Sequence, residues 1–232
     1  MSYYSRINKI GVELEGGWAT LFKHAEIVSE ISLPLATDLI RIPHWGEIVS
    51  PPMDPRQLYD WMMFYYPDKI PKPEELGTAH EKSAGLHLHV SLKDACDYTK
   101  ICSREFSNYV YERLEVWGNL KGLPTSHVFW SRLRGENRFT RRLFFPAFQT
   151  GRRDKDSSPS AARRTHINYC YGLHGTVEFR MLPMFETWKL SYEALALLIA
   201  SVEEFAVSPH KDLLRPITFH ISAEDFNNVC TF

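Results

Sequence analysis

Three short segments of the chain alternate hydrophobic and polar residues, a pattern typical of β-strands with one buried and one accessible face. They lie at residues 7–15, 85–92 and 174–182. Each contributes two polar side chains of a kind that can bind a metal ion or a phosphate group. These six residues are Glu13, Glu15, His87, His89, Glu178 and Arg180. If the three strands share a sheet, the pleat places all six on one surface.

Hydrophobic residues at spacings of three and four predict helices over 101–119 and 188–207. A further helix is expected to start at Asp54 and Pro55, because Asp caps a helix and Pro suits its first position. That helix should pack through Leu58, Trp61, Met62 and Tyr65. Strands mixed with helices predict an α+β domain with a mainly antiparallel sheet, whose hydrophobic face the helices cover.

Composition narrows the class of protein. The 232 residues, 44% of them hydrophobic, suffice for one core, so we expect a single domain over 1–232. A net charge of −1 argues against a general polyanion binder, and no apolar run approaches the ~20 residues that span a bilayer. The four cysteines lack C-x-x-C spacing, so we interpret them as reduced thiols of a cytoplasmic protein.

The six polar residues of the three strands predict a site for a divalent cation. Three carboxylates on one surface repel one another, and a bound cation removes that conflict. Carboxylates with imidazole and no thiolate suit Mg²⁺ or Mn²⁺ better than structural zinc. Arg180 beside Glu178 is then a candidate phosphate clamp. Taken singly, each pair is more typical of a solvated strand face or a surface ion pair than of a binding site, and only the combination of the three favours a site.

These segments resemble motifs of a known enzyme group. Residues 83–92, SAGLHLHVSL, resemble the Gly-x-His-x-His-x-Ser-Leu segment of glutamine synthetases. Residues 11–15 look like the first metal-binding strand of that fold, and residues 175–180 are similar to its late Glu-x-Arg strand. Residues 46–52, the short length and Asn168 more narrowly resemble the amidoligase family, small bacterial and phage relatives of glutamine synthetase and glutamate–cysteine ligase. The resemblance spans roughly residues 7–205.

The resemblance implies an ATP- and Mg²⁺-dependent carboxylate–amine ligase on a curved sheet with helices outside. Such an enzyme converts a carboxylate into an acyl phosphate, which an amine then displaces to form an amide or isopeptide bond. Its substrates would be a small-molecule or peptide carboxylate and amine, with no membrane partner. No Walker-type phosphate-binding motif is present, which argues against a P-loop ATPase.

The resemblance also implies roles for individual residues. The expected metal ligands are Glu13, Glu15, His87 and Glu178. The residues expected at the nucleotide are His87, His89 and Arg180, with Arg180 also stabilising the transferred phosphoryl group. Glu47 is a candidate further ligand or binder of the incoming amine, and is equally typical of a surface carboxylate.

Residues 121–164 form a basic insertion that interleaves arginines with aromatic residues, and a mobile loop is expected at 151–160. Its candidates for ATP phosphates are Arg138, Arg141 and Arg142. Alternatively the segment binds or helps modify a nucleic acid, because phosphates pair with arginine and bases stack on rings. A solvated face with a few ion pairs is a third interpretation. A metal-dependent hydrolase on the same sheet is a further rival to the ligase.

Overall fold

The computed structural model describes residues 4–16, 26–27, 46–66, 84–136, 142, 165–170 and 175–208, and at residues 26–27, 46–47 and 170 it describes the backbone alone. Some sequence predictions therefore fall outside the described residues. These are Arg138, Arg141, the loop at 151–160 and the side chain of Glu47.

The described strands form one six-stranded sheet, in the order β2-β3-β1-β4-β6-β5. Their bounds are β1 (Ile7–Gly16), β2 (Glu26–Ile27), β3 (Gly46–Val49), β4 (Gly85–Leu92), β5 (Ile167–Cys170) and β6 (Thr176–Pro183). Every neighbouring pair is antiparallel. The predicted α+β class and antiparallel sheet are confirmed, and the three strands with unusual polar residues are β1, β4 and β6, side by side at the centre.

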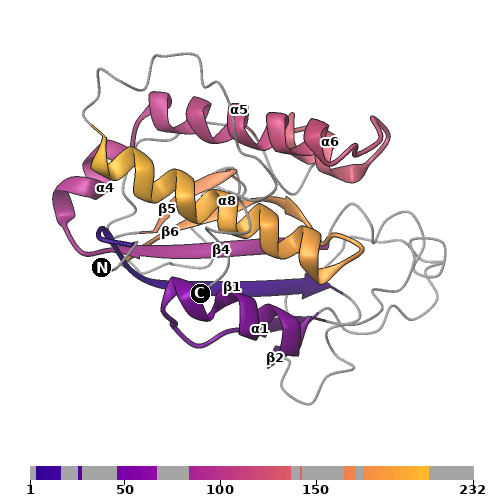
Figure 1. The fold of residues 1–232 in the computed structure, drawn as a ribbon, viewed down its shortest axis with the longest axis horizontal. Helices are drawn as coiled ribbons and strands as arrows, with labels where there is room; N and C mark the ends of the chain where they lie inside the picture. The colour runs from indigo at the N-terminus through magenta and orange to yellow at the C-terminus, as the bar shows by residue number, and fades with distance from the viewer. Residues whose placement is uncertain are drawn as a thin grey trace, which may run out of the picture.

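The helices belong to one hydrophobic layer against the sheet, with α5 and α8 side by side (Figure 1). Their bounds are α1 (Leu58–Tyr65), preceded by the 3₁₀ turn η2 (Pro55–Gln57), then α4 (Ala95–Ile101), α5 (Arg104–Leu120), α6 (Val128–Leu133) and α8 (Trp188–Val207). The hydrophobic residues of the alternating strands, such as Val12, Leu88 and Phe179, are fully buried. Phe106 of α5 packs edge-on against Phe179 of β6. The opposite face of the central strands carries the polar residues.

Local sequence explains where several helices begin. Asp54 caps η2 and forms a capping box with Gln57, as expected from Asp followed by Pro. Ser103 caps α5 through the amide of Phe106. The helix expected over 101–119 is α5, which begins at Arg104 because Ser103 caps it. The preceding helix α4, which ends at Ile101 before Cys102, was not predicted. None of the described helices is both long and apolar enough to cross a membrane.

One predicted packing contact is wrong, and one strand was missed. Tyr65 does not pack inward as expected but is 37% exposed, while Tyr66 is buried. The reason is that α1 ends at Tyr65, and Tyr66 leaves the helix in extended conformation with its hydroxyl bonded to the carbonyl of Phe185. The edge strand β5 was not predicted, because four residues give too short an alternation to detect.

Candidate active site

Strand register brings the six predicted polar residues onto one face of the sheet. Glu13 of β1 lies opposite His87 of β4, and His89 lies opposite Glu178 of β6. His87 and Glu178 are 1% and 2% exposed, whereas Glu13, Glu15, His89 and Arg180 are half-buried. If this face of the sheet were simply solvent-exposed, all six side chains would be accessible to water. Instead, two of them are fully enclosed among the other polar groups.

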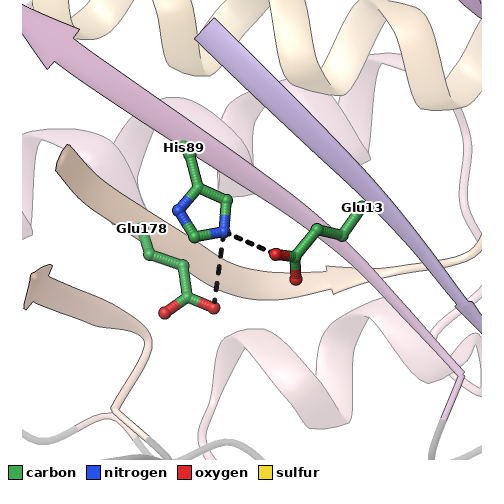
Figure 2. A group of neighbouring side chains, drawn as sticks. All are labelled: Glu13, His89 and Glu178. Atoms are coloured by element: carbon green, nitrogen blue, oxygen red, sulfur yellow. Dashed lines mark ion pairs between the residues drawn. The ribbon is translucent and has the colours of Figure 1, made fainter. Parts of the chain in front are cut away.

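Three of these side chains converge on one point with the geometry of a cation site (Figure 2). One donor atom from each of Glu13, His89 and Glu178 lies within 4.8 Å of the other two. His89 Nε2 is 3.0 Å from Glu13 Oε1 and 3.9 Å from Glu178 Oε1. Nevertheless this buried nitrogen makes no hydrogen bond with correct geometry to any described group. These three donor atoms are close enough to one another to share one cation.

Two neighbouring side chains orient the members of this group. Asn168 of β5 donates from Nδ2 to Glu178 Oε2 at 2.8 Å, which leaves Oε1 on the side of the histidines. Thr176 Oγ1 lies 3.4 Å from His89 Nδ1, so the other ring nitrogen, Nε2, faces the carboxylates. Outer partners of this kind fix the ring and carboxylate orientation of metal ligands.

His87 occupies a different position from His89. Its Nδ1 is 3.1 Å from Glu13 Oε2, and its Nε2 is 3.4 Å from Glu15 Oε2. Both ring nitrogens thus face carboxylates of β1, and among the described residues the group with metal-site geometry contains His89 rather than His87 or Glu15. A metal role for His87 and Glu15 stays a prediction.

Arg180 extends from β6 over the same face. Its Nη1 donates to Glu178 Oε1, and its side chain is 24% exposed. Its buried Nε has no hydrogen-bond partner among the described residues. The guanidinium therefore keeps donor capacity beside the converging carboxylates.

Arg132 of α6 is a site residue that sequence reasoning missed. The residue is 1% exposed, and its Nη1 and Nη2 donate to the carbonyls of Ala84 and Arg180 at 2.8 Å and 3.2 Å. Burial lowers the pKa of Arg132 to about 10, although nearby Glu15 opposes the shift. The available signal was that Arg132 lies three positions after buried Phe129, and therefore on the same face of the helix.

The surroundings of Glu13 and Glu178 lower the pKa of both carboxylates. Burial would raise the pKa of Glu13, but its hydrogen bond with His87 and the charges of His87 and His89 outweigh burial and hold the pKa well below its usual value. Burial would also raise the pKa of Glu178, but the charge of Arg180 and, after it, those of the two histidines outweigh burial and lower the pKa. Burial would lower the pKa of His89, yet Glu13 and Glu178 raise it overall. In the absence of a cation, the two carboxylates therefore favour the protonated form of His89.

Gly85 gives the polar groups room to approach one another. A Cβ at this position would lie 2.7 Å from His87 Nε2, 3.0 Å from Glu15 Oε2 and 3.2 Å from Arg132 Nη2. Contacts under 3.0 Å are not tolerated, so any side chain here would displace His87 or β4. Glycine at the start of the histidine strand is thus a condition for this arrangement.

The remaining predicted site residues lie elsewhere or lack side-chain detail. In backbone register Glu47 of β3 is opposite Glu15, with Glu26 of β2 next in the row. The guanidinium of Arg142 lies 4.1 Å from the centre of the Tyr111 ring. None of the contacts of the described residues places Arg142 beside the six polar side chains.

Searches against protein-family models, curated proteins and solved structures each found no match for this chain.

Proposed function

We propose that the protein is an ATP- and Mg²⁺-dependent ligase that joins a carboxylate to an amine through an acyl phosphate. The observation that carries the proposal is the convergence of Glu13, His89 and Glu178 beside Arg180 on one face of the sheet. The resemblance of these same strands to amidoligases supports the choice of reaction.

The residues present fit a hard divalent cation. Two carboxylates and one imidazole, without thiolate, form a donor set suited to Mg²⁺ or Mn²⁺. The unbonded His89 Nε2 is an orphaned buried atom that a cation would satisfy. When bound, such a cation supplies positive charge to the phosphate oxygens of ATP and to the transferred phosphoryl group.

Charge balance on the site face explains why a ligase would need the cation. When His89 is neutral, Glu13, Glu15 and Glu178 contribute three negative charges, against two positive charges from Arg132 and Arg180. ATP and a carboxylate substrate are both anions, so in that state the face without a cation would repel them. We assign cation binding to Glu13, Glu178 and His89 for this reason.

Arg180 is the residue that we assign to the phosphoryl group. Its guanidinium is held at one side by Glu178, and its Nε retains an unused hydrogen. A planar fork of donors matches phosphate oxygens in two places, which a lysine ammonium cannot do. Asn168 supports this role at a distance, because it fixes the carboxylate that holds Arg180.

The arginine-rich insertion offers less support for a nucleic-acid interface. Among its described members, Arg132 is buried, Arg134 pairs with Glu136 at 2.9 Å, and Arg142 stacks on Tyr111. Each of these three arginines is already engaged within the chain. We therefore propose the ligase rather than the nucleic-acid-binding alternative.

The proposal is tested by release of ADP from ATP with Mg²⁺, screened over pairs of carboxylates and amines. Glu178→Gln should reduce ADP release by about 100-fold or more, because it removes a charged ligand and the anchor of Arg180. Glu112→Gln, on the exposed side of α5, is the matched control and should leave the rate unchanged. Undiminished ADP release in Glu178→Gln would contradict the proposal, and turnover of an amide without ATP would favour the hydrolase.

A further inference from the structure

We propose that Arg132 is a positioning residue, which holds the backbone of Arg180 at an irregular point of β6 and so aims the Arg180 guanidinium. The backbone part of this inference rests on contacts within the chain. Its consequence for catalysis rests on the function proposed above.

The register of β6 changes next to the site. Leu88 lies opposite Phe179, whereas Leu86 lies opposite Leu182, so β6 has one more residue than β4 over this stretch. Arg180 falls inside it. An extra residue of this kind interrupts the regular ladder and turns side chains to new directions, often beside active sites. The direction of the Arg180 side chain therefore depends on what fixes its backbone here.

The backbone of Arg180 is held from two sides. Its amide donates to the carbonyl of His166 at 2.8 Å, and its carbonyl accepts from Arg132 Nη2 at 3.2 Å. Arg132 Nη1 at the same time binds the carbonyl of Ala84, immediately before β4. One guanidinium thus joins β6, at its irregular point, to the start of the histidine strand.

Arg132 is an unusual residue for a purely structural position. The residue is almost completely enclosed, and within the described part of the chain its guanidinium donates to two backbone carbonyls and to none of the carboxylates. An enclosed charge without such a partner costs free energy, so an apolar residue would serve packing better. The fork geometry accounts for the choice, since two parallel donors reach two carbonyls that a lysine cannot reach together.

The position of α6 explains how Arg132 reaches these carbonyls. Gly118 of α5 lies against the rings of Phe129 and Trp130, where a Cβ would come within 2.6 Å and 2.9 Å of ring carbons. This close approach seats α6 against α5 and places Arg132 over β6. Neither Gly118 nor Arg132 is in direct contact with Glu13, His89 or Glu178. Both therefore act on the site by fixing the position of the backbone.

The test compares Arg132→Lys with Arg134→Lys, an exposed control at the end of the same helix, by amide hydrogen exchange of the full chain. Arg132→Lys should speed exchange in β6 by about 10-fold or more while α8 keeps its protection, because only the fork is lost. Unchanged exchange in β6, or equal acceleration in α8, would overturn the proposal. If Arg132→Lys does not fold, Gly118→Ala replaces it, with the same expected pattern and the same contrary result.

Kinetics then test the link to Arg180. In the ligase assay Arg132→Lys should lower kcat by about 10- to 100-fold with the KM for ATP within about 3-fold. In an Arg180→Lys background, Arg132→Lys should lower kcat further by less than about 3-fold, because Arg132 acts through Arg180. Full additivity would overturn the proposal, as would full activity of Arg132→Lys, which keeps the charge. If the wild type releases no ADP with any substrate pair, the proposed function fails, while the exchange comparison still decides the role of Arg132.

Discussion

At the scale of single residues, the site depends on how closely unlike groups approach. Glu13 Oε2 and Glu15 Oε2 lie 3.1 Å and 3.4 Å from the two nitrogens of His87, and His89 Nε2 lies 3.0 Å from Glu13 Oε1. The pleat brings these groups together, but only a residue without a side chain at position 85 leaves them room.

Gly85→Ala is therefore expected to destabilise the fold by about 1–3 kcal/mol, because the added methyl group displaces His87 or β4. Urea unfolding followed by circular dichroism measures the change. Gly11→Ala is the matched control on the neighbouring strand, since a Cβ there would lie 3.7 Å from His89 Cβ, an ordinary contact. Equal stability of the two variants would contradict this explanation of Gly85.

The stabilising effect of Mg²⁺ should depend on pH in a defined direction. The pKa of His89 is raised above 6.5, so its stabilising charge is present below pH 6.5 and is lost as the pH rises through the raised pKa. The pKa values of Glu13 and Glu178 lie below 4.5, so their contribution persists above that pH and is lost only in acid. A cation thus competes with a proton at low pH and replaces it at high pH.

We accordingly expect Mg²⁺ to raise Tm more at about pH 8.5 than at about pH 6. At about ten times its dissociation constant, the cation should stabilise the fold by about 1.4 kcal/mol at the higher pH. Differential scanning calorimetry with and without MgCl₂ measures this, and Glu178→Gln should abolish the difference. A larger Mg²⁺ effect at the lower pH would show that the cation does not replace a proton on His89.

At the scale of elements, one carboxylate ties the last described helix to the first strand. Glu203 of α8 accepts from the backbone amides of Arg6 and Ile7 at 3.1 Å and from the Ser5 hydroxyl at 2.8 Å. These amides precede or open β1, so α8 fixes the start of the strand that carries Glu13.

Glu203→Gln should cost about 1–3 kcal/mol of stability, because an amide accepts fewer and weaker hydrogen bonds than a carboxylate. Thermal unfolding compares it with the exposed control Glu112→Gln. A loss of Tm no greater than in the control would mean that the amides of Arg6 and Ile7 are satisfied in another way.

The sequence predicted the elements whose patterns are long and regular. Strands β1, β4 and β6 follow from strict alternation, and α8 from its repeat of hydrophobic residues. It missed α4, whose seven residues give too short a repeat of hydrophobic positions, and it placed the start of α5 before the Ser103 cap. The sequence also could not show that His89, rather than His87, joins Glu13 and Glu178. That choice depends on how the side chains point toward Glu178, which lies 89 positions after His89 and is brought beside it only by the sheet.

At the scale of the whole molecule, the helices and the site share one sheet but use opposite faces. Fully buried residues such as Leu88 hold the helical layer, while their neighbours His87 and His89 serve the polar face. Remote parts of the chain thus meet at one point because β1, β4 and β6 are adjacent in the sheet. The proposed ligase activity depends on this convergence of side chains from the three strands.

Mn²⁺ binding measured by electron paramagnetic resonance tests the central claim most directly, since it needs neither substrate nor turnover. We predict saturable binding by the wild type, unchanged in the exposed control Glu112→Gln and at least about 10-fold weaker in His89→Gln and in Glu178→Gln. Binding that is absent in the wild type, or that keeps its affinity in both site variants, would contradict the account.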